Sequence, residues 1–257
     1  MNALELKVLL DLKYEQYNRP DFVKDDPVQI PHLFTKKEDI EIAGFLTALI
    51  AWGRRDLIIR SAKRIIEAMD MQPYAFLTQA ERQDWYRLEN FVHRTLNGID
   101  CIALLTSLRE VYLAGDSLET IFQTGIKPGD TDIRHGIISA RERLTSNPGF
   151  PERTHKHLAN PAKGSSAKRI NMYLRWMVRQ DKRGVDFGIW KNIDPALLIV
   201  PLDVHTGNVG RKLGLLTRKQ NDWKAALALT EKLREMCPED PVRYDFSLFG
   251  LGVYKEI

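Results

Sequence analysis

The sequence predicts an all-α protein, and three observations indicate this fold class. Apolar residues recur every three or four positions along most of the 257-residue chain, which is the period of an amphipathic helix. Strand patterns are nearly missing, and only the apolar run 196–201 fits a short extended segment. Gly, Asn and Pro residues separate the helical patterns. Because no repeat and no clear linker divides the chain, we expect a single unit over residues 1–257.

The first half of the chain predicts a series of helices with one buried helix among them. Residues 1–18 form an amphipathic pattern. Thr35 and Glu38 match a capping box, which marks the start of a helix. Residues 42–52 are apolar nearly all round, which is typical of a central buried helix, and this helix is expected to end at Gly53. Further helices are predicted over 56–69, 80–96, 101–113, 116–123 and 133–144.

Composition and residue spacing exclude several classes of protein. Cys101 and Cys237 are far apart and do not match zinc or iron–sulfur spacing, so we expect no metal, no iron–sulfur cluster and no other cofactor. His155 and His157 lack acidic or cysteine partners at ligand spacing. The N-terminus is charged and no apolar run could cross a bilayer, which predicts a cytoplasmic protein without membrane contact.

Positive charge is concentrated in the second half of the chain. The net charge is only +4, but residues 160–192 contain eight Lys or Arg and two Asp. A local density of this kind favours a polyanion as partner. Elsewhere, His93 and Arg94 are interpreted as a surface pair near a helix end.

A lysine opens one of the late helices. Ser165 or Ser166 is placed to cap a helix whose first turn contains Lys168. The helix dipole and partial burial both favour the neutral amine, which is a nucleophile. Arg175 and Arg179 are expected on a cationic polar face of the same helix.

An aspartate opens the next helix. Asp203 is predicted to be its N-cap, which keeps the carboxylate ionised by accepting amide hydrogen bonds. Gly207 and Gly210 remove side chains from one surface, and hydrogen-bond donors lie beside them at His205, Asn208, Arg211 and Lys212. Together these features predict a phosphate-binding surface.

These two segments, GSSAKRIN at 164–171 and PLDVHTGNVGRKLGL at 201–215, resemble the helix-hairpin-helix DNA glycosylases, the superfamily of endonuclease III and the 8-oxoguanine glycosylases. The whole chain also resembles an uncharacterised bacterial family of helical proteins. The resemblance implies two helical lobes with a DNA-binding cleft. It assigns Lys168 as the Schiff-base nucleophile and Asp203 as the essential carboxylate.

The hairpin departs from the superfamily pattern in two ways. It carries one glycine, Gly164, where two are usual before the lysine, and 35 positions separate Lys168 from Asp203, which is about twice the common spacing. Lys163 is therefore a rival nucleophile, and with Gly164 and Ser165 it is also a predicted DNA contact.

The resemblance further implies a pocket for an extruded base. On the last helix, Asp245 and Phe249 stand four positions apart, as do a polar and an aromatic residue that bind the base in 8-oxoguanine glycosylases. The alternative is that Phe249 belongs to the core. The sequence AWGRR at 51–55 resembles a loop that enters the minor groove, which adds Trp52 to the pocket and Arg54 and Arg55 to the DNA contacts. The alternative is an ordinary helix end.

The function predicted in this way is a DNA repair glycosylase with β-elimination lyase activity, acting on double-stranded DNA with a damaged base such as an oxidised purine. The alternative is a non-catalytic nucleic-acid-binding module on the same scaffold. A third interpretation, an unrelated helical interaction protein, treats the basic stripe as a solvated face.

Overall fold

The computed structural model describes residues 2–257, and these residues are mostly helical. Helices account for 61% and strands for 2%, which confirms the all-α class. The chain forms two compact units. The terminal unit contains residues 2–24, 128–134 and 160–257, and the central unit contains 25–127 and 135–159. None of the helices built from the described residues combines the length and the apolar content that crossing a bilayer requires.

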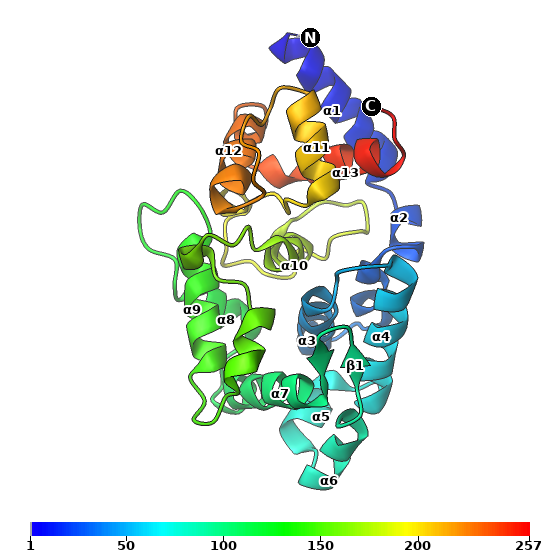
Figure 1. Ribbon diagram of the computed structural model, residues 1–257, viewed down its shortest axis with the longest axis vertical. Coiled ribbons are helices and arrows are strands. Elements are labelled where there is room, and N and C mark those ends of the chain that lie inside the picture. Colours follow the sequence, from blue (N-terminus) through cyan, green and yellow to red (C-terminus); the bar gives the residue numbers. More distant parts are fainter. Residues whose placement is uncertain (1) are drawn as a thin grey trace. The chain divides into compact units, whose positions relative to one another are not determined.

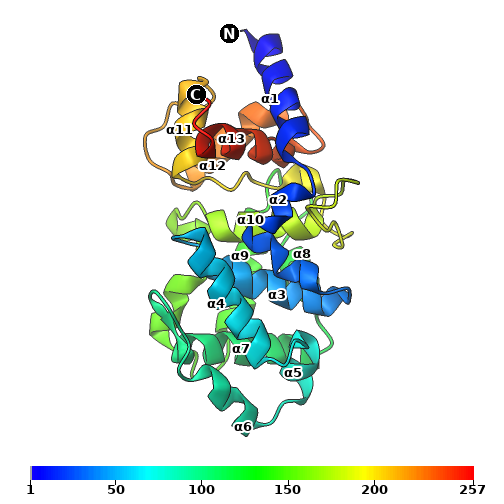
Figure 2. The ribbon, with the colours of Figure 1, turned by 90° about the vertical axis from the view of Figure 1, so that its right-hand side faces the viewer.

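The central unit is organised around α3 (Lys37–Leu49), in which every residue from Ile40 to Leu49 is buried. This confirms the predicted central helix. Figure 2 shows α4 (Arg55–Ala68) beside it. The other elements of the unit are η1 (Pro27–Gln29), η2 (Pro31–Leu33), α5 (Pro73–Gln79), α6 (Arg82–Trp85), η3 (Tyr86–Leu88), β1 (Val92–His93), β2 (Leu96–Asn97), α7 (Gly98–Leu113), α8 (Leu118–Gln123), α9 (Arg134–Thr145) and η4 (Glu152–His157).

Both predicted ends of α3 are wrong. The helix starts after Lys36, which makes no side-chain cap, so Thr35 and Glu38 do not form a capping box. It stops at Leu49 rather than Gly53. A β-carbon at Gly53 would meet the Arg94 guanidinium at 2.7 Å, so the turn after α3 is fixed by a distant segment.

The helix predicted over 80–96 is also wrong. This stretch forms α6, η3 and an antiparallel hairpin of β1 and β2. Arg94 adopts a left-handed conformation (φ 55°) between the two strands. His93 is not part of a surface pair, because its side chain is buried and its Nδ1 lies 2.9 Å from the Ser61 hydroxyl.

In the terminal unit, helix α13 (Asp245–Val253) packs against α1 (Ala3–Tyr17) and α11 (Val204–Lys212) (Figure 1). Two glycines of α13 allow this packing. A β-carbon at Gly250 would overlap the Tyr17 ring, and one at Gly252 would lie 3.1 Å from His205. The remaining elements are α2 (Asp21–Lys24), η5 (Pro161–Lys163), α10 (Lys168–Val178), η6 (Pro195–Leu197), α12 (Trp223–Arg234) and η7 (Pro241–Tyr244).

The segment between α10 and η6 folds back onto α10. The amide of Phe187 donates to the Trp176 carbonyl at 2.8 Å, and the amide of Trp190 donates to the Met177 carbonyl at 2.9 Å. The Trp190 ring also packs edge-on against Tyr173. The long separation between Lys168 and Asp203 is therefore occupied by a segment that covers α10.

Candidate active site

The turn that leads into α10 orients the first residue of that helix. Gly164 (φ 85°) and Ala167 (φ 49°) both adopt left-handed conformations, and for alanine this conformation is strained. The Ser165 hydroxyl accepts a hydrogen bond from the Ala167 amide at 3.2 Å. Helix α10 begins at Lys168 without a side-chain cap, so the expectation that Ser165 or Ser166 caps it is wrong. The turn is nevertheless fixed, because the Gly164 carbonyl accepts from the amide of Trp223.

Asp203 is the N-cap of α11, as predicted. Its Oδ1 accepts a hydrogen bond from the Thr206 amide at 2.9 Å. Its backbone carbonyl accepts from the Asn221 side chain at 3.1 Å. With Oδ1 and the main chain held, the second carboxylate oxygen has a defined direction.

That second oxygen faces Lys168. The distance from Lys168 Nζ to Asp203 Oδ2 is 4.0 Å, and the two side chains are 29% and 23% exposed. The amine also lies 4.0 Å from the Met172 sulfur. Tertiary folding thus brings together two groups that are 35 positions apart. The ion-pair partner of Asp203 is Lys168, whereas Lys163 is exposed in η5. Which lysine acts as a nucleophile stays a prediction.

The expectation that Arg175 and Arg179 line an exposed cationic face is wrong, because both side chains are buried. Arg175 pairs with Asp186 (Nε–Oδ1 3.2 Å) and with Asp245. Arg179 pairs with Asp186 at 3.0 Å, and its further carboxylate partners are Asp181 and Asp240. A buried guanidinium must be paired, so these arginines are enclosed by their carboxylate partners and offer no exposed cationic face.

The buried carboxyl of Asp245 pairs with Arg175 and interacts electrostatically with both Lys168 and Asp203. Burial raises the pKa of Asp245 to about 6, against the attraction of Arg175; Asp203 raises this pKa further and Lys168 lowers it. Phe249, one turn later, is half-buried and packs edge-on against Phe22. Contact of either residue with an extruded base stays a prediction.

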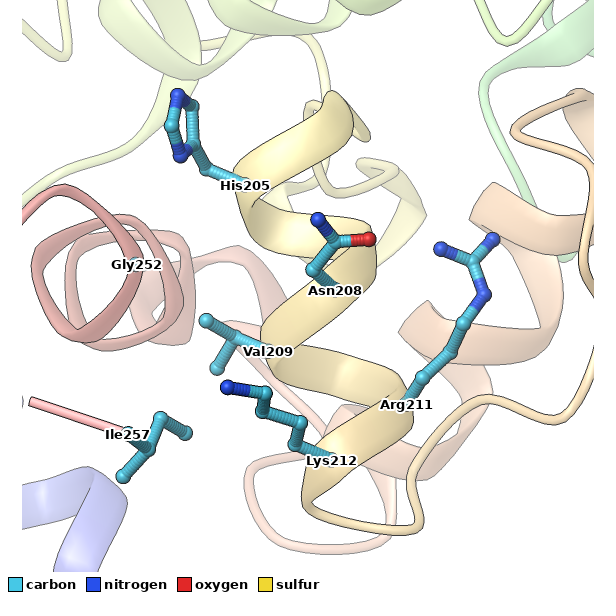
Figure 3. Close-up of a pocket in the computed structure, with 7 residues that line it drawn as sticks. All are labelled: His205, Asn208, Val209, Arg211, Lys212, Gly252 and Ile257. Atoms are coloured by element: carbon cyan, nitrogen blue, oxygen red, sulfur yellow. The ribbon is translucent and has the colours of Figure 1, made fainter. Parts of the chain in front are cut away.

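A shallow pocket of about 380 Å³ lies along α11 (Figure 3). Its polar lining comes from predicted DNA-binding residues, namely His205, Asn208, Arg211 and Lys212. In Figure 3, Lys212 and Val209 point toward Ile257, whereas Arg211 points away from it. Arg211 instead donates to the carbonyls of Arg218 and Lys219.

The glycines of α11 do not leave an open surface. Gly207 is buried, and a β-carbon there would lie 2.8 Å from the Asn221 side chain. Gly210 faces Leu229 of α12. The absence of side chains at these glycines predicts close approach of another backbone, but the nearest atoms are side chains of the same unit, which occupy the space.

The remaining predicted site residues lie in the central unit. The Trp52 ring stacks on His157 and lies edge-on to His93, with ring centroids 6.1 and 5.2 Å apart. Arg54 is exposed and pairs with Asp56 at 2.8 Å, and Arg55 begins α4. Roles for these residues in binding a base or DNA stay predictions.

Sequence reasoning missed Asp186, the carboxylate shared by both buried arginines. Its only sequence signal is its place in the long insertion after α10. Across residues 2–257, no group of three or more His, Cys, Asp or Glu side chains is arranged to hold a metal ion.

A family model covers residues 26–254, and that family is described as proteins of unknown function (DUF2400). The chain belongs to DUF2400. No curated protein and no solved structure gives a significant match. The DUF2400 match includes the Lys168–Asp203 pair and both buried arginines. Helix α1 precedes the matched region, yet the Arg179 guanidinium donates to its Tyr14 hydroxyl at 2.7 Å.

Proposed function

We propose that this protein is a DNA repair glycosylase with β-elimination lyase activity. The observation that carries the proposal is the 4.0 Å separation of the Lys168 amine and the Asp203 carboxylate, both of which keep some exposure to solvent. An amine beside a fixed carboxylate is suited to attack an electrophilic carbon that develops positive charge. The C1′ atom of a damaged nucleotide is such a carbon.

The proposed reaction assigns one role to each group. The neutral Lys168 amine attacks C1′, and the bond from C1′ to the damaged base breaks with transfer of a proton to the base. Asp203 accepts a proton from the attacking amine and stabilises the cationic sugar. Asp203 passes the proton that it took from the amine to the departing base. The electron pair left on the Lys168 nitrogen then breaks the C1′–O4′ bond, O4′ takes a proton, and the opened sugar carries an imine at C1′. Loss of a proton from C2′ of this imine expels the 3′ phosphate, and water releases the lysine.

Recognition in this proposal requires extrusion of the base from the duplex. The exposed donors around the amine are suited to hold the flanking phosphates, and they come from the entry turn and from α11. Lys163, His205, Asn208 and Lys212 are all exposed. Double-stranded DNA with a damaged base, including an oxidised purine, is the proposed substrate.

Borohydride trapping tests the proposal. Duplexes with an abasic site or with 8-oxoguanine are incubated with the protein and reduced, which converts an imine into a stable adduct. We expect a covalent adduct for the wild type and for Lys163→Ala, and none for Lys168→Ala. Base release is measured separately, because an exposed lysine can also trap an abasic site.

The same experiment separates the alternative function. DNA binding that weakens steeply with salt, without an adduct or base release, would identify a non-catalytic nucleic-acid-binding module. An adduct that persists in Lys168→Ala and disappears in Lys163→Ala would transfer the nucleophile to Lys163. Absence of both adduct and binding contradicts the proposal.

A further inference from the structure

An open pocket of about 470 Å³ lies between the end of α1 and the loop that follows α10. Both segments belong to the terminal unit. The volume falls within the range of small-molecule sites, roughly 300–1,000 Å³. Cations make up half of the lining, which consists of Asn18, Arg19, Pro20, Asp181, Lys182 and Arg183. A pocket with this lining is suited to an anion.

Two of the lining cations are available to a ligand. Among the side chains that the structure describes, neither the Arg19 guanidinium nor the Lys182 amine forms an ion pair with a carboxylate, and both residues are exposed. Asp21, the acidic residue nearest to Arg19 in the sequence, pairs instead with Lys24 at 2.6 Å. The charges of Arg19 and Lys182 are therefore not neutralised within the protein.

The third cation, Arg183, is held by a contact that a ligand can share. Its Nη2 contacts Glu15 Oε1 at 2.6 Å, and its guanidinium lies 5.0 Å from the centre of the Tyr14 ring. Glu15 is exposed, and an exposed ion pair contributes little free energy. A guanidinium has several donors, so a bound anion can use those that Glu15 leaves.

The carboxylate in the pocket lining, Asp181, is already compensated. Its Oδ2 accepts from Arg179 at 2.6 Å and from the Asn18 side chain at 2.7 Å, and its Oδ1 accepts from the Arg183 amide at 2.9 Å. Against burial, which raises it, Arg179 and these hydrogen bonds hold the pKa of Asp181 below its usual range. Because the buried Arg179 offsets this charge, the lining keeps an excess of positive charge.

The wall formed by the end of α1 is rigid. Asn18 is fully buried, and its amide donates to the Tyr14 carbonyl at 2.9 Å. Arg19 Nε donates to the Glu15 carbonyl at 2.9 Å, which leaves the two terminal nitrogens of the guanidinium for a ligand. Pro20 restricts the backbone that follows. The pocket is therefore formed before a ligand arrives, which lowers the entropic cost of binding.

We propose that this pocket binds a phosphomonoester, the group found at the end of a nucleic-acid strand and on free mononucleotides. A phosphomonoester carries close to two negative charges at pH 7, whereas a phosphodiester inside a strand carries one. Three cations around one pocket favour the dianion, and the planar guanidinium groups of Arg19 and Arg183 match pairs of phosphate oxygens. The inference goes beyond the proposed function, because the lining includes neither Lys168 nor Asp203.

Two short probes test the proposal in the full-length protein. Trithymidylate is labelled with fluorescein at its 3′ end and carries either a 5′-phosphate or a 5′-hydroxyl, so the probes differ only in the phosphomonoester. Fluorescence anisotropy gives the Kd of each. We expect the wild type to bind the 5′-phosphate probe about tenfold more tightly, and the double variant Arg19→Gln/Lys182→Gln to bind both probes equally.

Two further variants separate the pocket from general effects of charge and stability. Glu15→Gln frees the Arg183 guanidinium and should increase the preference for the 5′-phosphate about threefold. Lys232→Gln removes the same charge from an exposed lysine of α12 outside the pocket, and it should leave the preference unchanged. Near-ultraviolet circular dichroism verifies that each variant is folded.

Thymidine 5′-monophosphate as a competitor distinguishes the two sources of the phosphomonoester. Displacement of the 5′-phosphate probe at equal concentration supports a site for a free mononucleotide. Tight binding of the probe without displacement supports a site for a strand end.

Equal affinity of the wild type for both probes overturns the inference, as does a preference that persists in Arg19→Gln/Lys182→Gln. Failure here can be told apart from failure of the proposed function, because the covalent adduct at Lys168 is measured in a separate reaction. A protein that traps DNA without preferring the 5′-phosphate probe keeps the proposed function and loses this inference, and the reverse result does the opposite.

Discussion

The buried carboxylate Asp100 of the central unit pairs with an arginine that keeps contact with solvent, whereas the buried carboxylate Asp186 of the terminal unit pairs with an arginine that is buried as well. Asp100 has no exposed side-chain surface, but its partner Arg153 is 43% exposed. Asp186 and its partner Arg179 are exposed by 0% and 1%. Burying both charges costs more desolvation free energy than burying one. The buried charges of the terminal unit are stable only because Arg175 and Arg179 share their carboxylate partners in one network.

The largest expected effect comes from removing the buried cation Arg179 of the terminal unit, compared with removing the partly exposed Arg153 of the central unit. Arg179→Met leaves three carboxylates without their shared partner, namely Asp181, Asp186 and Asp240. We expect a loss of about 3–5 kcal/mol in the free energy of unfolding, measured by urea denaturation. The matched variant in the central unit is Arg153→Met, which removes the same kind of cation from Asp100. Asp100 is less affected, because it keeps its hydrogen bond from the Thr154 hydroxyl at 2.8 Å. Its expected cost is at most about 1 kcal/mol. Equal losses would remove the distinction between the units.

A smaller effect is expected from the pH dependence of Asp240. Burial raises the pKa of this carboxyl to about 6, against the attraction of Arg179. Between pH 4 and pH 6 the unfolded state ionises and the folded state does not, so wild-type stability should fall as pH rises through this window. The free energy of unfolding of Asp240→Asn, taken relative to the wild type, should rise by about 2–3 kcal/mol between pH 4 and pH 6 and stay constant above pH 6. Urea unfolding at several pH values measures the difference, and a flat difference would contradict the assignment.

The smallest effect is expected at His93. Its pH dependence has the opposite sign to that of Asp240, because stability falls as pH falls. Burial lowers the pKa of His93, so the folded state keeps the ring neutral. Stability from this group is present at neutral pH and is lost as pH falls below the pKa of the unfolded state. His93→Gln should flatten this pH dependence between pH 7 and pH 5. The measurement is the same urea series, and a wild-type slope retained in the variant would show that another group is responsible.

The local features of the candidate site could be predicted from the sequence. Lys168 does begin a helix, and Asp203 does cap the next one. The cap at Asp203 follows from a residue preference within a single turn, whereas α10 begins at Lys168 without the serine cap that the sequence predicts. The entry turn could not be predicted in detail, because Ala167 adopts a left-handed conformation that only its surroundings can impose.

The prediction that the polar face of α10 is exposed is wrong for a physical reason. Helical spacing identifies which side chains share a face, but it does not identify what covers that face. Arg175 and Arg179 follow the spacing of an exposed stripe, yet carboxylates from the following segment and from near the C-terminus bury them. His93 was misread in the same way, because its burial depends on Trp52 and Ser61.

The helical class, the buried helix α3 and the N-cap at Asp203 can be read from the order of residues, because apolar periodicity and capping act over a few neighbouring positions. Only the tertiary structure decided that Lys168 meets Asp203 and that Arg175 meets Asp245, which is 70 positions away. Desolvation and ion pairing depend on which distant atoms exclude water from a charge, and the local pattern of residues does not contain that information.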